Sequence, residues 1–144
     1  MAAEASLKDS QPFDMRLSET ATAQDVSEAA LSVYARALGE EPGLDLLARR
    51  GLLDGKSGRL TNAGVILLAR NPGEHIARAG VSVEVRADAQ RAVLAKRGWG
   101  ADFVFDEPLI TMLPVVESHL DELLRPRGDG GYPRYAYREG LVNA

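Results

Sequence analysis

Glu139 and Asn143 are the two residues whose types and spacing could carry chemistry. They lie four positions apart, so on a helix both side chains would share one face. A carboxylate can orient or deprotonate an attacking water. An asparagine amide oxygen is a hard, neutral ligand suited to Mg²⁺, an ion that proteins usually share with the phosphates of a substrate. A solvated helix face shows the same spacing, and spacing alone favours this simpler interpretation.

The other candidate motifs fit turns and solvated side chains better than they fit sites. Residues 54–58 read Asp-Gly-Lys-Ser-Gly, but Arg50 stands where a phosphate-binding loop has its upstream glycine. His75 and His119 are far apart in the sequence and lack metal-ligand spacing. No Ser-His-Asp arrangement is supported either. Glu139 and Asn143 therefore remain the sharpest candidates.

The composition is that of an ordinary globular domain. Of the 144 residues, 45% are hydrophobic and 26% are charged, which provides enough apolar surface for a core. The net charge of -4 argues against bulk electrostatic binding to nucleic acid, and the lack of cysteine excludes disulfides and zinc–thiolate sites. No apolar run could cross a bilayer, and the first residues lack the order of a signal peptide. We therefore expect a cytoplasmic protein without a membrane partner.

The hydrophobic pattern predicts an α+β fold in which several helices pack on a small, antiparallel sheet. The first helix is expected at 25–38. Asp25 and Glu28 stand at capping-box spacing at its start, and Gly39 stands where a glycine would end it.

Residues 44–70 show the order short helix, turn and apolar helix. The turn is expected at 54–58, and Thr61 is the expected N-cap of a helix at 61–70. This order could belong to a winged-helix-like DNA-binding module. The basic face that such a module needs is missing, so this interpretation is kept as an alternative.

The second half of the chain predicts strands followed by a long helix. Residues 80–87 alternate valine with polar residues, and a second strand is expected at 101–105. The segment between them, 90–100, is predicted to be a mobile basic loop. A long amphipathic helix is expected at 109–124, with a late start or a kink because of Pro114.

These expectations divide the chain into three parts. Residues 1–11 are small and polar and are expected to form a flexible tail. Residues 12–127 are expected to form the α+β domain. Residues 128–144 are expected to be a linker followed by the first helix of another module, because a helix begins after the glycine-rich stretch and the chain stops within it.

Three segments, in this order, resemble one bacterial family. Residues 60–72, LTNAGVILLARNP, resemble its "LTNAG" segment that ends in Asn-Pro. Residues 132–144, with Tyr-Pro followed by REGLVNA, are similar to its "YP…REALVNA" segment, and residues 12–14 look like the "SFE" segment that precedes them. The family comprises RecG-like helicase-related proteins and transcriptional regulators that carry an AlbA-type (Schlafen-like) N-terminal domain.

The resemblance implies a site and its cofactors. The REGLVNA segment resembles the N-box of the GHKL superfamily of ATP-binding proteins. On that resemblance Glu139 is the acidic residue that polarises water, and Asn143 is the magnesium ligand. Gly140 replaces the usual alanine, which weakens the helix by up to about 1 kcal/mol. ATP and Mg²⁺ are thus implied for the full-length protein, and neither is expected to bind this chain alone, which lacks the glycine boxes.

Two functions follow from the resemblance. The first is a connector and interaction module that joins a DNA-associated domain to an ATP-binding domain, so its partners are other domains of the same protein, DNA through the missing N-terminal domain, and a possible second copy of the chain. The second is part of an ATPase, with Glu139 as base and Asn143 holding Mg²⁺. The winged-helix-like DNA-binding module is the third alternative.

Overall fold

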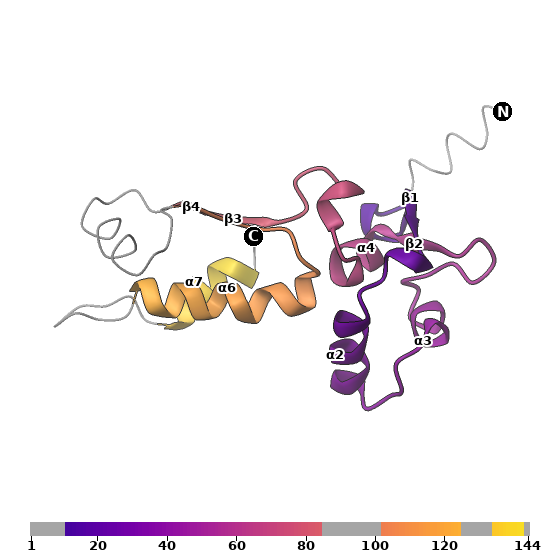
Figure 1. Cartoon of the computed structure of the whole chain (residues 1–144), viewed down its shortest axis with the longest axis horizontal. Helices are drawn as coiled ribbons and strands as arrows, with labels where there is room; N and C mark the ends of the chain where they lie inside the picture. Colours follow the sequence, from indigo (N-terminus) through magenta and orange to yellow (C-terminus); the bar gives the residue numbers. More distant parts are fainter. Residues whose placement is uncertain (1–10, 85–101, 125–133, 143–144) are drawn as a thin grey trace. The chain divides into compact units, whose positions relative to one another are not determined.

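The chain adopts an α+β fold, as expected. A computed structural model describes residues 11–84, 102–124 and 134–142 (Figure 1). Within these residues it contains five α-helices and two antiparallel sheets of two strands each.

Two compact units make up the chain. Unit 1 comprises Met1–Gly80 and Asp106–Thr111, and unit 2 comprises Val81–Phe105 and Met112–Ala144. The expected domain limits at residues 11 and 127 stay predictions. Across the described residues, none of the helices combines the length and the apolar character that a bilayer crossing needs.

Unit 1 is built around a pair of strands. Its elements, with η marking a 3-10 helix, are η1 (Phe13–Met15), β1 (Leu17–Thr22), η2 (Ala23–Asp25), α2 (Glu28–Leu38), α3 (Leu44–Arg49), β2 (Arg59–Thr61), α4 (Asn62–Leu68) and η3 (Pro72–Glu74). Strands β1 and β2 are antiparallel, and β2 continues the pairing through an isolated antiparallel bridge between Leu60 and Leu53. The strands therefore hold the chain before α2 against the chain after α3.

Helix α2 begins three residues later than the sequence predicted. Asp25 does take part in a capping box, but its partner is Thr22, so the box caps the start of η2 and not of α2. The side chain of Ser27 caps α2 by accepting a hydrogen bond from the Ala30 N–H. The predicted end of the helix is confirmed, since Gly39 adopts φ 68°, the left-handed conformation that glycine adopts without strain.

Helix α4 has the predicted cap and an earlier end. The Thr61 hydroxyl accepts a hydrogen bond from the Gly64 N–H at 3.2 Å, as an N-cap residue should. The helix stops at Leu68 and not at Arg70, because Ala69 turns to the extended conformation and forms an antiparallel bridge with Val26. The end of α4 is therefore fixed to the chain that precedes α2.

The core of unit 1 lies between the strands and the three helices. Its buried side chains come from every element of the unit except the 3-10 helices: Ala21, Val26, Ala30, Leu47, Leu52, Leu53, Leu60, Val65, Leu68 and Ala69. Helix α4 also lies very close to the backbone at Leu52, just before the hairpin that the Leu53–Leu60 bridge forms with the 54–58 turn. A Cβ atom at Gly64 would lie 2.2 Å from the Leu52 carbonyl oxygen, so only glycine fits at this point of the helix.

Unit 2 combines a β-hairpin with two helices. Strands β3 (Val81–Glu84) and β4 (Asp102–Phe105) are antiparallel, and helices α6 (Leu109–Leu124) and α7 (Arg134–Val142) follow them. The predicted strands are confirmed over these residues, although β3 begins one residue after Gly80. Residues 85–87 and 101 of the predicted strands and the basic loop at 90–100 lie outside the described residues. The long helix has its predicted limits, and it begins at Leu109 with Pro114 inside it, so the late start considered for it does not occur.

The aromatic face of β4 packs on α6. Phe103 and Phe105 share one face, as the alternation predicted, with ring centroids 6.4 Å apart. The His119 ring meets both of them edge-on, at 5.6 Å and 5.4 Å. Such edge-to-face contacts are favourable for aromatic rings and fix the hairpin on the helix.

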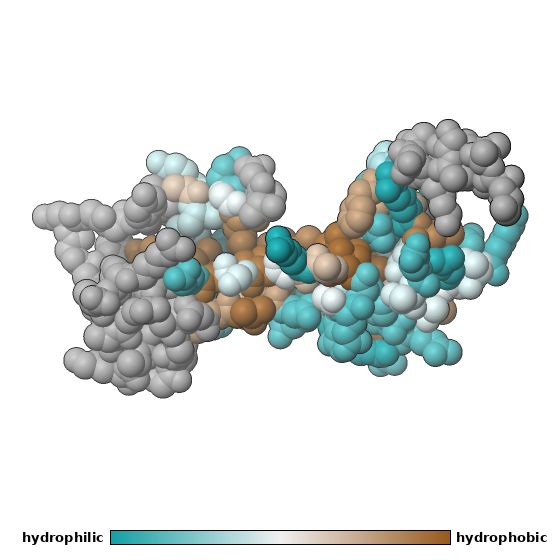
Figure 2. All heavy atoms as spheres, turned by 90° about the horizontal axis from the view of Figure 1, so that it is seen from above, coloured by the Kyte–Doolittle hydropathy of each residue, from teal (hydrophilic) through white to brown (hydrophobic). Residues whose placement is uncertain are grey.

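The surface of the molecule is mixed in character. Figure 2 shows hydrophobic residues in brown lying among hydrophilic ones in teal on the face that it presents. The large exposed hydrophobic side chains include Phe13, Met15, Leu44, Val104 and Tyr135.

Candidate functional site

Glu139, the predicted catalytic residue, lies on α7 with its side chain exposed. Asn143, the predicted magnesium ligand, lies outside the described residues. The neighbour of Glu139 has a structural contact, because Arg138 Nε lies 3.5 Å from Glu117 Oε1 on α6. The arginine of the REGLVNA segment thus helps to attach α7 to α6.

Magnesium and ATP require more than unit 2 is seen to provide. Mg²⁺ takes oxygen ligands in octahedral geometry, usually from one or two carboxylates together with phosphates and waters. Among the described residues there is no group of three or more His, Asp and Glu side chains that could hold a metal ion. One exposed carboxylate does not form a nucleotide site by itself, so the roles of Glu139 and Asn143 stay predictions.

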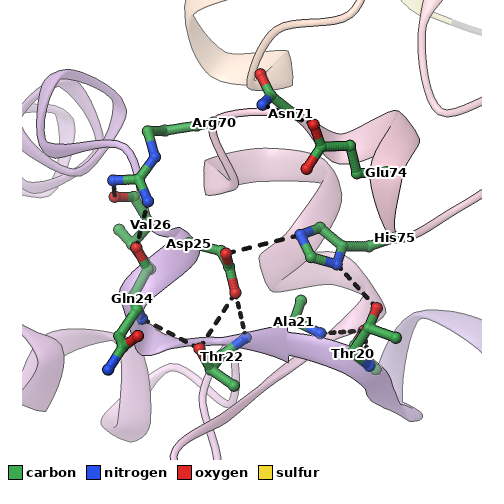
Figure 3. A network of polar contacts seen from close by, with 11 residues as sticks. Thr20, Ala21, Thr22, Gln24, Asp25, Val26, Arg70, Asn71, Glu74 and His75 are labelled. Atoms are coloured by element: carbon green, nitrogen blue, oxygen red, sulfur yellow. Dashed lines mark hydrogen bonds and ion pairs between the residues drawn. The ribbon is translucent and has the colours of Figure 1, made fainter.

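One polar cluster of unit 1 was not predicted from the sequence. It joins Thr20, Asp25 and His75, which lie on β1, on η2 and directly after η3 (Figure 3). Thr20 Oγ1 lies 2.8 Å from His75 Nδ1, and His75 Nε2 lies 3.9 Å from Asp25 Oδ1. The His75 side chain is only 11% exposed. A histidine thus bridges two segments that are about fifty residues away from it in the sequence.

The Asp25 carboxylate is held mainly by Thr22. Asp25 Oδ2 accepts hydrogen bonds from the Thr22 N–H at 2.8 Å and from the Thr22 hydroxyl at 3.1 Å. The backbone hydrogen bond is the main reason why the pKa of Asp25 lies below its ordinary value; the Thr22 hydroxyl, His75 and Arg70 lower it further, and burial opposes them. Asp25 is therefore a charged cap whose other oxygen faces His75.

Arg70 completes this network from the end of α4. Its guanidinium donates to the carbonyl oxygens of Gln24 at 2.5 Å and of Val26 at 3.5 Å (Figure 3). Its backbone N–H donates to the Asp25 carbonyl oxygen at 2.9 Å. Three hydrogen bonds from one residue thus fix η2, and the Asp25 carboxylate with it, against α4.

The order hydroxyl, imidazole, carboxylate invites comparison with a catalytic triad, but the geometry differs in three ways. In a triad the imidazole donates to the carboxylate, whereas 3.9 Å between His75 and Asp25 exceeds hydrogen-bond distance. The ring is also reversed, because Nδ1 and not Nε2 faces the Thr20 hydroxyl. The Asp25 carboxylate, moreover, already accepts two hydrogen bonds from Thr22. The network is therefore suited to joining segments and not to activating a nucleophile.

A second cluster, the arginine clasp, consists of Glu40, Arg49 and Arg50. The Glu40 carboxylate accepts one hydrogen bond on each oxygen, from Arg49 Nη2 at 2.5 Å and from Arg50 Nη2 at 2.6 Å. The hydrogen bond from Arg50, followed by that from Arg49, lowers the pKa of Glu40 below its ordinary value. Both arginine side chains remain about half exposed, at 61% and 46%. No sequence motif links the three residues. Glu40 follows the end of α2, and the two arginines lie at the end of α3 and directly after it, so the packing of the two helices brings them together.

The Asp-Gly-Lys-Ser-Gly segment is a turn, as the sequence predicted. The Asp54 carboxylate accepts hydrogen bonds from the Ser57 N–H at 3.0 Å and from the Ser57 hydroxyl at 2.5 Å. These hydrogen bonds hold the pKa of Asp54 below its ordinary value. Gly58 closes the turn at φ 69°. A carboxylate thus takes the amide that a phosphate-binding loop would offer to a phosphate.

The residues of the LTNAG segment have structural roles in unit 1. Thr61 caps α4, and Gly64 allows the Leu52 carbonyl to approach. Asn62 connects α4 to the first residues of the unit, since its side-chain amide donates to the Phe13 carbonyl oxygen at 2.9 Å and its backbone N–H donates to the Arg16 carbonyl oxygen at 2.8 Å. The segment therefore works as a joint between η1, the hairpin and α4.

The end of the same segment is joined to residues that precede α6. Asn71 Nδ2 donates to Glu74 Oε1 at 3.1 Å, and Pro72 is buried. The Gly73 N–H donates to Asp106 Oδ1 at 2.8 Å. The Asn-Pro-Gly sequence thus begins η3 and provides the contact point for Asp106.

Comparisons with known proteins identify no relative, since no protein family, no curated protein and no solved structure matches this chain.

The T-x-x-D spacing of Thr22 and Asp25 is a local signal that predicts the capping box. The position of His75 against Thr20 has no local signal, because the two residues are 55 positions apart.

Proposed function

We propose that this chain is a connector and interaction module of an ATP-binding transcriptional regulator, placed between a DNA-associated domain and an ATP-binding domain. The resemblance of residues 12–14, 60–72 and 132–144 to the RecG-like helicase-related family motivates this proposal. Its partners are then the neighbouring domains of the same protein, and DNA is reached through the domain that precedes the chain.

The observation that carries the proposal is the structural use of the LTNAG segment. The Leu52 carbonyl oxygen fills the space beside Gly64, and the Asn62 amide connects α4 to Phe13. These residues serve as caps and close contacts within unit 1, so the resemblance in this segment supports a common framework and not a reaction centre in unit 1.

Titration of the 144-residue chain with Mg-ATP in a calorimeter tests whether ATP binding belongs to the neighbouring domain and not to this chain. The proposal assigns the glycine boxes that cover ATP to the neighbouring domain, so we expect negligible heat of binding. Micromolar affinity would contradict the proposal, because the chain would then contain a nucleotide site of its own.

A second candidate function, direct contact with DNA, is supported by the order of elements in unit 1. Strand β1, helices α2 and α3, the Leu53 bridge, the 54–58 turn and β2 follow one another, and β2 pairs with both β1 and Leu53. Winged-helix modules place a helix pair and a strand–turn–strand wing in this order around such a sheet. A titration with duplex DNA at several salt concentrations tests it, since phosphate contacts give salt-dependent affinity.

A further inference from the structure

The second helix of the α2–α3 pair is the element that would face DNA in such a module. Its inner side is buried through Leu46 and Leu47, which leaves the outer side to Leu44, Asp45 and Arg49. Arg50 follows directly after the helix and is also exposed. Helix α3 has only six residues, so it offers little surface for reading base edges. Contacts from here would be made mainly to phosphates.

The 54–58 turn lies beside this helix. A Cβ atom at Gly55 would come within 3.9 Å of Ala48 Cβ, which is ordinary van der Waals contact. The turn therefore packs against α3, and Lys56, next to Gly55, is exposed on it. In Figure 1 this turn projects from the end of the strands, as a wing does. The turn that carries Lys56 thus packs against the helix that carries Arg49.

Glu40 pairs with both arginines and neutralises one of their two positive charges. Each oxygen of its carboxylate accepts a hydrogen bond from one guanidinium, at 2.5 Å and 2.6 Å. Two guanidinium groups that converge on a two-oxygen anion also form a geometry that suits a phosphodiester. The Glu40 backbone is fixed separately, because its N–H donates to the Ala35 carbonyl oxygen at the end of α2. The side chain can therefore turn away without disturbing the helix pair.

We propose that the Glu40 carboxylate occupies, between Arg49 and Arg50, the position of a phosphate of duplex DNA, and that the DNA backbone displaces it. The clasp is then an intramolecular competitor. It weakens DNA binding by unit 1 until DNA is brought close, for example by a neighbouring domain. The inference rests on the second candidate function, direct contact of unit 1 with DNA, and it concerns residues of this chain alone.

The competitor explains how an acidic chain can contain a DNA contact. With Glu40 charged and hydrogen-bonded to both arginines, phosphates must replace two short ion pairs before they gain any contact. Exposed ion pairs of this kind contribute little stability, so the exchange is reversible. The hydrogen bonds from Arg50 and Arg49 hold the pKa of Glu40 below its ordinary value.

The test is the affinity of the whole chain for a fluorescent duplex DNA, measured by anisotropy at salt concentrations from about 50 to 200 mM, where phosphate contacts respond strongly. The Glu40→Gln variant removes the charge of the competitor and is expected to bind more tightly than the unmodified chain. Each arginine that contacts a phosphate steepens the fall of log affinity with log salt by about 0.9, so the contribution of both arginines to the affinity of Glu40→Gln should fall about tenfold over this range.

Two further variants make the result specific. Glu41→Gln changes the net charge equally at the next position, which is exposed, and is expected to leave the affinity as it is. Adding Arg49→Gln and Arg50→Gln to Glu40→Gln is expected to abolish the gain. The proposal is overturned if Glu40→Gln and Glu41→Gln behave alike, or if the gain survives loss of both arginines.

A polyglutamate competitor distinguishes phosphate from carboxylate partners. If Glu40→Gln binds polyglutamate as tightly as DNA, the clasp recognises acidic protein segments, and the DNA proposal fails. Failure of this inference leaves the connector proposal standing, because that proposal is tested by nucleotide binding and by coupling between domains and not by the Glu40 variants.

Discussion

Asp106 Oδ1 accepts a hydrogen bond from the Gly73 N–H at 2.8 Å, although the two residues are 33 positions apart. A Cβ atom at position 73 would lie 2.6 Å from Asp106 Oδ2, so glycine is required for the carboxylate to come this close. The chain that leaves unit 1 after Gly80 thus returns to it at Asp106, beside η3. The contact therefore holds the residue that directly follows β4 to unit 1.

Replacing Asp106 tests the value of this contact. Asp106→Ala leaves the Gly73 N–H without its charged acceptor, so the free energy of unfolding should fall by about 1 kcal/mol, as for other lost caps. Glu107→Ala alters a neighbouring exposed carboxylate and should change it by less than about 0.5 kcal/mol. Urea unfolding followed by circular dichroism measures both. Equal effects would mean that the Gly73 contact contributes nothing.

Two glycines in helices should respond in opposite directions to alanine. Gly64→Ala places a methyl group against the Leu52 carbonyl oxygen, and the overpacking should cost about 1–3 kcal/mol. Gly140→Ala meets nothing within 4 Å and should stabilise α7 by up to about 1 kcal/mol. Thermal unfolding of the two variants measures the difference. A Gly64→Ala variant as stable as the unmodified chain would exclude the close approach of α4 to Leu52.

Asp25 should make the stability of unit 1 sensitive to acid. Its pKa is lowered in the folded state, so its contribution is fully present above the unfolded value of 3.8 and is lost as the pH falls through the folded value. Asp25→Asn should lower stability by about 1 kcal/mol at neutral pH and by much less near pH 2.

The control for this pH dependence is Glu19→Gln, an exposed carboxylate on β1. It should leave the unfolding free energy nearly unchanged across the same pH range. Urea unfolding at a series of pH values measures both variants. An Asp25→Asn variant whose loss of stability is the same at pH 2 and pH 7 would show that the charge of Asp25 has no part in the effect.

Glu139 should matter to ATP turnover only where the neighbouring ATP-binding domain is present. In the full-length regulator, Glu139→Ala should lower the rate of ATP hydrolysis by about 10²–10⁴-fold if the carboxylate acts as general base. Glu117→Ala, which removes the partner of Arg138 on α6, separates an effect of helix attachment from an effect of chemistry. Hydrolysis rates of Glu139→Ala equal to those of the unmodified protein would remove Glu139 from catalysis.

Local signals predicted the elements that depend on neighbours in the sequence. The Thr61 cap, the left-handed Gly39 and the Asp54 turn all satisfy backbone groups within a few positions, so residue type and spacing suffice to find them. The alternation that placed Phe103 and Phe105 on one face is equally local.

Contacts between distant segments were not predictable from the sequence. The start of α2 was placed too early because Asp25 can serve in two ways in a capping box. It could be the N-cap residue paired with Glu28, but in the structure its carboxylate accepts from Thr22 instead. The Thr20–His75 hydrogen bond and the close approach of Gly64 to Leu52 depend on how α4 packs. The arginine clasp likewise depends on the angle between α2 and α3, which periodicity does not determine.

The connector proposal is tested most directly by thermodynamic coupling in the full-length regulator. ATP affinity is measured with and without saturating duplex DNA, since a connector that links the two domains must make the two binding events interdependent. We expect DNA to change the ATP affinity by about 5–150-fold, which corresponds to about 1–3 kcal/mol of coupling. Identical ATP affinities in the presence and absence of DNA would contradict the proposal.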